Sequence, residues 1–214
     1  MTGPAASGPG RNRGGRQSAA GIAAANLLDP FPMIIIVHGY DGSGPGHWQR
    51  WLEQELQRRD IEAILPDLPD PTAPQKDVWV QTLAAVAESA RAPVTFVCHS
   101  LGCWAVDHLF SERGLLGARA VLLVAPPSPY LLFEPVDTFM PPPCRRAVWA
   151  PVAARTLLVG SDNDDFTTPE EFAEIAHKLG VRSHVIPGAG HINLDSGYGP
   201  WPFALEWLQA VAAL

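Results

Sequence analysis

The chain has 214 residues, and its content of 47% hydrophobic and 17% charged residues is a globular balance with enough apolar material for a core. Its 22 acidic and 15 basic residues give a formal net charge of −7, which argues against a nucleic-acid-binding protein. Three cysteines without ligand spacing argue against a disulfide framework or a zinc site, and no apolar run approaches the roughly 20 residues that span a membrane.

The first 30 residues differ in composition from the rest. Residues 1–30 are rich in Gly, Ala, Ser and Pro and contain few large apolar groups. Such a segment cannot bury enough surface to offset its ordering entropy, so we expect a disordered N-terminal extension. No charged region leads directly into an apolar stretch, so we expect no signal peptide and a cytoplasmic location. The ordered domain is predicted to cover residues 31–214.

From Phe31 onwards the sequence predicts alternating strands and helices. Short apolar runs predict strands at 33–37, 61–66, 94–98, 120–125, 155–160 and 182–187. Apolar side chains at helical spacing predict helices at 47–59, 79–90, 101–113 and about 201–212, and a capping box from Thr168 to Glu171 opens another. This alternation indicates a mainly parallel sheet with helices on both faces, which is a three-layer α/β/α sandwich.

One long stretch, residues 126–150, interrupts this alternation. It contains seven prolines, which are too many for a regular helix throughout. It follows a predicted strand, where long irregular segments often cover a binding site. We therefore expect a short cap over a cleft.

The ten residues from Val94 to Cys103 carry the strongest chemical signal. They predict a strand, a sharp turn and a helix, and they fit the nucleophile elbow G-x-S-x-G with Cys98 in place of the first glycine. Ser100 would then lie above the sheet edge at a helix N-terminus, where free N–H groups favour a developing oxyanion. The sequence therefore predicts Ser100 as a nucleophile.

A nucleophilic serine needs a base, and the base needs an orienting carboxylate. In folds with this elbow the chain order is Ser, then Asp or Glu, then His. Three acids, Asp162, Asp164 and Asp165, follow the predicted strand at 155–160, and His191 lies in a glycine-rich loop after the strand at 182–187. Because parallel strands end at the same sheet edge, we expect one of these acids and His191 to meet Ser100.

The remaining parts of such a site have candidates as well. The loop His38-Gly39-Tyr40 follows the first strand, so the backbone N–H groups of Tyr40 and Leu101 are expected to bind the oxyanion. Asp162–Asp165 lacks the glycine and the distal glutamate of a calcium loop. No metal and no organic cofactor is expected.

Several of these segments together resemble the small serine hydrolases related to retinoblastoma-binding protein nine and bacterial YdeN. The resemblance covers about Met33 to Leu214 and implies a trimmed α/β-hydrolase with six parallel strands and a minimal cap. Matching the turn pattern places the triad acid on Asp164, although Asp165 stands where the family often has proline, which leaves Asp165 or Asp162 open. The segments that carry this resemblance are His38-Gly39-Tyr40, His47-Trp48, Pro66-Asp67, His99 to Cys103, Ser161 to Asp164, Gly190 to Asn193, Ser196-Gly197 and Trp201-Pro202.

These residues predict a serine hydrolase that cleaves small carboxylic esters, or amides, through an acyl-enzyme. With Tyr40, the side chains of Phe133, Phe139 and Trp149 are expected to line an apolar substrate pocket. The expected partner is a small-molecule substrate rather than nucleic acid or a membrane. The alternative is a protein-binding module on a hydrolase fold with a dormant site, and a third is a cofactor-free haloperoxidase or C–C bond hydrolase.

Overall fold

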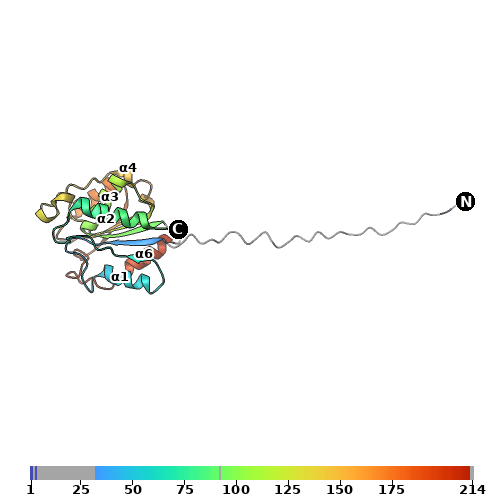
Figure 1. Ribbon diagram of the computed structural model, residues 1–214, viewed down its shortest axis with the longest axis horizontal. Coiled ribbons are helices and arrows are strands. Elements are labelled where there is room, and N and C mark those ends of the chain that lie inside the picture. The colour runs from blue at the N-terminus through green and yellow to red at the C-terminus, as the bar shows by residue number, and fades with distance from the viewer. Residues whose placement is uncertain (2, 4–31, 92, 213–214) are drawn as a thin grey trace.

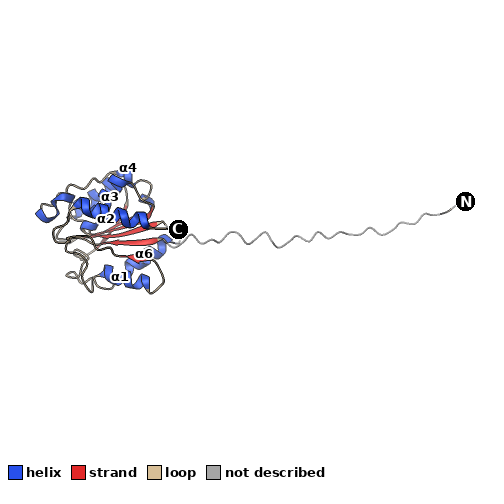
Figure 2. Cartoon of the chain, in the orientation of Figure 1, coloured by secondary structure: helices blue, strands red, loops and turns tan. Residues whose placement is uncertain are grey.

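The structure, a computed structural model, describes residues 1, 3, 32–91 and 93–212. The N-terminal extension expected at 1–30 lies outside the described residues, apart from Met1 and Gly3. The described chain folds into one twisted sheet with helices on both faces, as Figures 1 and 2 show.

The sheet has six strands in the order β2-β1-β3-β4-β5-β6, and every neighbouring pair is parallel. This topology confirms the predicted three-layer α/β/α class. The central strands β1 and β3 are apolar or nearly so along their length, because both of their faces are covered. The strands are β1 (Met33–Val37), β2 (Ala63–Ile64), β3 (Val94–His99), β4 (Ala118–Val124), β5 (Thr156–Ser161) and β6 (Arg182–Ile186).

The helices divide between the two faces (Figure 1). Helices α2 (Lys76–Ser89), α3 (Leu101–Arg113), α4 (Arg146–Trp149) and α5 (Pro169–Leu179) pack on one face, and α1 (Trp48–Gln57) and α6 (Pro202–Ala212) pack on the other. Two short 3₁₀ helices, η1 (Glu134–Phe139) and η2 (Ala153–Arg155), complete the described elements. The two layers give the sheet a core on each side, and full burial of one large apolar side chain contributes about 1.5–3 kcal/mol.

Strand β2 is shorter than the predicted run at 61–66. It pairs with β1 only through Ala63 and Ile64. The next backbone N–H, that of Leu65, donates to the Glu53 carboxylate of α1 at 3.0 Å instead of continuing the ladder, and Pro66 has no N–H to offer. The edge strand therefore ends after two residues.

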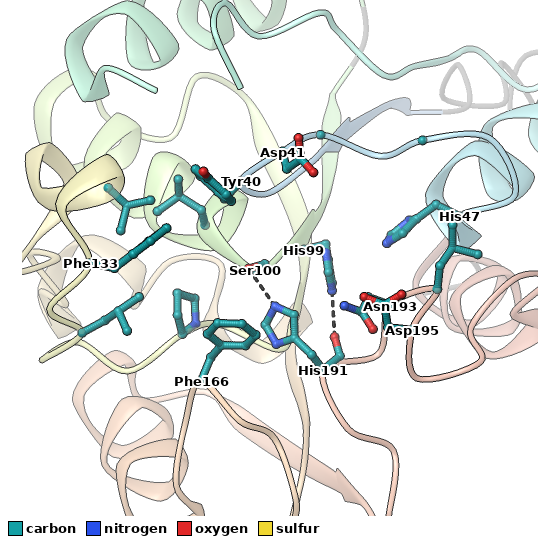
Figure 3. A pocket seen from close by; sticks show the side chains of 17 residues that line it. Tyr40, Asp41, His47, His99, Ser100, Phe133, Phe166, His191, Asn193 and Asp195 are labelled. Atoms are coloured by element: carbon teal, nitrogen blue, oxygen red, sulfur yellow. Dashed lines mark hydrogen bonds between the residues drawn. The ribbon is translucent and has the colours of Figure 1, made fainter. Parts of the chain in front are cut away.

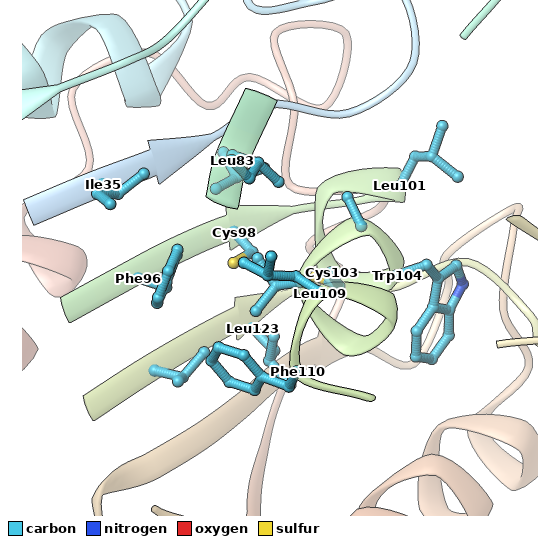
Figure 4. Close-up of a cluster of buried hydrophobic side chains, with 14 of the residues drawn as sticks. Ile35, Leu83, Phe96, Cys98, Leu101, Cys103, Trp104, Leu109, Phe110 and Leu123 are labelled. Carbon is cyan, nitrogen blue, oxygen red and sulfur yellow. The ribbon is translucent and has the colours of Figure 1, made fainter. Parts of the chain in front are cut away.

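Helix α3 forms the centre of the larger core (Figure 4). Its residues from Leu101 to Asp107 are all buried, and Phe110 packs edge-on against Phe96 of β3 at 5.5 Å between ring centroids. Cys98, which replaces a motif glycine, is fully buried in the same cluster beside Cys103. The larger side chain at 98 is accommodated because it fills space between β3 and α3.

The proline-rich stretch at 126–150 is fastened to α3 by a carboxylate that sequence analysis did not identify. Asp107 is fully buried, and its two oxygens accept from the Trp149 indole N–H and the Cys144 backbone N–H, each at 2.7 Å. Burial raises the pKa of Asp107, while these hydrogen bonds oppose the rise. The neighbouring His108 donates from Nε2 to the carbonyl oxygen of Phe139 at 2.9 Å. The end of this stretch is therefore part of the core.

Candidate active site

The turn that presents Ser100 is sterically constrained. Ser100 has φ 53° and ψ −126°, a backbone conformation that costs energy in any residue with a side chain. Its N–H donates to the carbonyl oxygen of Val124 at 2.9 Å. A Cβ at Gly102 would lie 2.6 Å from the carbonyl oxygens of Val37 and His38, so only glycine fits there. The close packing of strand, turn and helix holds Ser100 at the carboxyl edge of the sheet.

His191 bridges Ser100 and Asp164 (Figure 3). Its Nε2 lies 2.9 Å from Ser100 Oγ, and its Nδ1 lies 3.0 and 2.9 Å from the two oxygens of Asp164. A carboxylate can only accept, so Nδ1 carries the proton and Nε2 is free to accept from the serine hydroxyl. The side chains of Asp164 and His191 are only 3% and 11% exposed, which strengthens the polar contacts between them.

The other two acids of this turn lie elsewhere. Asp162 is exposed and accepts from the Gly188 backbone N–H at 2.7 Å. Asp165 is exposed, and no hydrogen bond of its side chain occurs within the described part of the chain. Of the three candidates, the structure brings Asp164 alone to the imidazole of His191.

Two residues of the acid-bearing turn also hold the loop that carries His191, which sequence analysis missed. Ser161 Oγ accepts from the Ala189 N–H at 2.9 Å, and Asn163 Oδ1 accepts from the Gly190 N–H at 2.8 Å. With the bond from Gly188 to Asp162, three successive amides of the histidine loop are bound by three successive side chains. The sequence signal for this arrangement is a run of short polar residues, Ser161 to Asp164, at the end of β5 and a glycine-rich loop after β6.

His99, the residue before the nucleophile, contacts the backbone of His191. Its Nε2 donates to the His191 carbonyl oxygen at 2.9 Å, and the two rings lie 5.1 Å apart. Burial, together with the nearby His191 and His47, holds the pKa of His99 well below its usual value. His99 is therefore a neutral donor that lies against the backbone of the loop carrying His191.

Two further histidines flank this centre. His47 caps α1, where Nδ1 accepts from the Gln49 N–H at 3.2 Å, and burial lowers its pKa to about 4. His38 donates from Nδ1 to the carbonyl oxygen of Gly39 at 2.8 Å, and burial lowers its pKa as well. Both rings are neutral at physiological pH and adjoin the loop after β1.

Two backbone amides near Ser100 remain available. Among the described residues, the N–H groups of Tyr40 and Leu101 donate to no protein acceptor. Leu101 opens α3, and Tyr40 follows Gly39, where a Cβ would lie 2.7 Å from the Cβ of Ser100. The two amides predicted from the sequence therefore adjoin the serine and can donate to an atom bound there.

Ser100 opens into a cavity of about 420 Å³ (Figure 3). One side of the cavity is apolar and the other is polar, with Ser100 and His191 between them. Tyr40 packs edge-on against Phe133 at 5.2 Å, and the ring of Phe166 lies 4.6 Å from that of His191. The apolar lining includes Pro127, Leu131, Phe133, Val136 and Phe166, and the polar lining includes Asp41, His47, Asn193 and Asp195.

The expected pocket residues divide between the cavity and the core. Phe133 lines the cavity, whereas Phe139 and Trp149 are fully buried in the core against α2 and α3 and are not among the described lining residues. The expectation for these two is therefore wrong, because their hydrogen bonds to Asp107 and His108 draw their segment inward. Phe166, which sequence analysis missed, occupies the place beside His191.

Residues 32–91 and 93–212 contain neither a cluster of metal ligands nor a membrane-spanning helix. No cluster of three or more His, Cys, Asp or Glu side chains there is arranged to hold a metal ion. No helix in the same described residues combines the length and the hydropathy needed to cross a bilayer.

Comparisons with known proteins agree with this architecture. A family model described as serine hydrolase matches residues 34–210. YdeN from Bacillus subtilis (strain 168) is 26% identical over 182 residues, which cover 83% of this chain and 94% of that protein. The expected resemblance to YdeN-related proteins is confirmed.

Two solved structures show the same fold. The crystal structure of a YdeN-like protein from Pectobacterium atrosepticum superposes with a TM-score of 0.70 at 25% identity, covering 85% of this chain and 90% of that one. The structure of YdeN from B. subtilis superposes with a TM-score of 0.73 at 21% identity, covering 86% of this chain and all of that one (100%).

Proposed function

Since the chain belongs to the serine hydrolase family, we propose that it hydrolyses small carboxylic esters with Ser100 as nucleophile, His191 as general base and Asp164 as the orienting acid. The observation that carries this proposal is the unbroken hydrogen-bond chain from Ser100 Oγ through the imidazole to the Asp164 carboxylate. Groups placed in this way can attack, accept a proton and stabilise the imidazolium that forms.

In the first half-reaction Ser100 Oγ forms a bond to the carbonyl carbon while its proton passes to His191 Nε2. The carbonyl electron pair moves to the oxygen, where the N–H groups of Tyr40 and Leu101 stabilise the negative charge. The tetrahedral intermediate then collapses and the bond to the leaving alcohol breaks. His191 gives its proton to the alcohol oxygen, and the acyl group stays on Ser100.

In the second half-reaction a water molecule replaces the alcohol. His191 takes one proton from the water as its oxygen attacks the acyl carbon, and the same two amides hold the second oxyanion. Collapse of this intermediate breaks the bond to Ser100 Oγ, which recovers its proton from His191. The products are a carboxylic acid and the free serine.

The size and lining of the cavity favour small esters with short acyl chains. About 420 Å³ lies near the lower end of the roughly 300–1,000 Å³ that ligand sites span. Phe133, Leu131 and Val136 offer apolar contacts to an acyl chain. Amides are attacked by the same groups, and their poorer leaving group makes them the slower substrates.

A panel of p-nitrophenyl esters from acetate to decanoate tests this proposal, together with labelling by a fluorophosphonate probe. We expect turnover to be fastest for short chains and to be lost in Ser100→Ala along with labelling. Ser89→Ala, an exposed serine on α2, is the matched control and should behave as the parent. Hydrolysis that survives Ser100→Ala would refute the mechanism. A parent protein that neither turns over any ester nor reacts with the probe would favour the dormant binding module.

A further inference from the structure

A second cavity, of about 250 Å³, lies near the amino ends of the central strands, whereas Ser100 follows their carboxyl ends. Its floor consists of Ile34, Thr95 and Ala120, which pair across β1, β3 and β4. Its walls come from the end of α1 and from α6, which pack on this face of the sheet. The wall residues include Leu56, Ile61, Leu205, Leu208 and Val211. The cavity is therefore a gap between two helices over an intact sheet.

One polar group interrupts this apolar floor. Thr95 is only 1% exposed and is one of the residues that line the cavity. Because Thr95 lines the cavity, its hydroxyl can donate a hydrogen bond to a polar group of a molecule held there.

Two arginines adjoin the same cavity. The guanidinium of Arg59 already pairs with Glu55 at 2.7 Å. Arg119, by contrast, makes no ion pair with any residue that the structure describes. It precedes Ala120, the residue that pairs with Thr95, so the guanidinium and the hydroxyl come from neighbouring strand positions. Arg119 is thus a cation without an ion-pair partner in the described chain, next to an apolar gap, in a protein of net charge −7. This combination is complementary to a ligand that has an anionic head group and an apolar body.

We propose that this cavity binds a small amphipathic carboxylate of the medium-chain fatty acid class. Its chain packs between α1 and α6, Arg119 binds the carboxylate, and Thr95 Oγ1 donates a second hydrogen bond. Arginine suits this head group because its N–H donors match the two carboxylate oxygens. A volume of about 250 Å³ is below the usual range for drug-sized ligands, which limits the chain to about eight to ten carbons.

Calorimetric titration of the full chain with octanoate tests the proposal, with 1-octanol and octyltrimethylammonium as ligands of matched chain and different head. We expect octanoate to bind and the other two to bind at least tenfold more weakly. Arg119→Gln should weaken octanoate binding by about 10- to 100-fold, because a charge-assisted hydrogen bond is lost. Thr95→Val, which keeps the shape, should weaken it by about 3- to 10-fold.

Ala120→Leu separates this cavity from the one beside Ser100, because it fills the floor between β3 and β4 and leaves the catalytic edge untouched. It should abolish octanoate binding while p-nitrophenyl acetate hydrolysis stays at the parent level. Arg155→Gln, an exposed arginine away from this cavity, is the matched control and should bind as the parent. Unchanged binding in both Arg119→Gln and Ala120→Leu, or equal affinity for octanol, would overturn the proposal. So would a full chain that binds no octanoate, as expected if a segment of the same protein filled the cavity.

Discussion

The imidazole of His99 donates a hydrogen bond to the backbone carbonyl oxygen of His191 at 2.9 Å, so the residue before Ser100 holds the peptide that carries its proposed base. The two rings lie 5.1 Å apart, and the contact spans 92 positions of the chain. The nucleophile and the base are therefore aligned from two directions: through their own hydrogen bond and through the backbone behind it.

His99→Leu should lower kcat for ester hydrolysis by about tenfold to 100-fold, because small misplacement of a catalytic group is costly. His99→Gln keeps a side-chain donor and should recover part of this loss. Since burial holds the pKa of His99 well below its usual value, the ring stays neutral and the pH dependence of kcat/KM should keep its shape in both variants. Initial rates between pH 5 and 9 measure this. A new inflection in the profile, or unchanged kcat in His99→Leu, would contradict the positioning role.

The three acids of one turn make a matched set of variants. Asp164→Asn should lower kcat by about 10⁴-fold, because an amide no longer holds the His191 tautomer or stabilises the imidazolium. Asp165→Asn should retain nearly full activity, since its side chain is exposed and makes no hydrogen bond among the described residues. Asp162→Asn keeps an acceptor for the Gly188 N–H, so its kcat should fall only slightly. Single-turnover kinetics compares the three. A deep loss in Asp165→Asn with an active Asp164→Asn would move the triad acid.

Acid stability should depend on His47. Its folded pKa is about 4, below the value of 6.5 for an exposed histidine, so the unfolded chain binds more protons than the folded one between these values. The stabilisation is complete above pH 6.5 and is lost as the pH falls from about 6.5 to 4, by roughly 1–3 kcal/mol. Protonation of Nδ1 would also remove the acceptor that caps α1.

His47→Asn tests this, because asparagine is a good helix cap that does not titrate. Urea unfolding of parent and variant at pH 5.0, 6.0 and 7.0 should show a shallower pH dependence in the variant. Equal slopes would show that other groups control acid stability. His184→Asn, an exposed histidine on β6, is the control and should keep the slope of the parent.

Cys98 tests whether the elbow motif or the local packing sets stability. Cys98→Gly restores the glycine that the motif expects, yet it should destabilise the fold by about 1–3 kcal/mol. It removes a fully buried side chain from the core between β3 and α3 and adds a flexible residue to a central strand. Cys98→Ala should lower the free energy of unfolding by less than Cys98→Gly does. Urea unfolding midpoints rank the three proteins, and a Cys98→Gly variant at least as stable as the parent would contradict this account.

The alternation of strands and helices was predictable because it depends on local periodicity. The run that became β1 is apolar throughout, and the run that became β3 is apolar except for Thr95 and His99. The spacing of Trp48, Leu52 and Leu56 indicated α1. The capping box at Thr168 also formed as predicted, with Thr168 Oγ1 accepting from Glu171 N–H and the Glu171 carboxylate accepting from Thr168 N–H. Each of these features lies within a few residues of sequence.

The misassigned residues depend instead on long-range packing. An aromatic residue in a proline-rich stretch can face a cleft or the core, and for Phe139 and Trp149 the decision rests with Asp107 and His108 on α3. A carboxylate in the middle of an apolar helix gives no local sign of its buried partners, which lie 37 and 42 positions away. For the same reason the sequence left the choice among Asp162, Asp164 and Asp165 open, since it depends on where a distant loop brings His191.

The three hydrogen bonds from Gly188, Ala189 and Gly190 to the side chains at 162, 161 and 163 join two loops that are far apart in the sequence. One loop supplies the backbone N–H donors and the other supplies the side-chain oxygen acceptors. If only one of the two loops is exchanged, the donors or acceptors of the other are left without partners. Loop grafting between relatives should therefore transfer residues 161–164 and 187–193 as a single cassette. We therefore expect substitutions in one of these loops to constrain which substitutions the other tolerates.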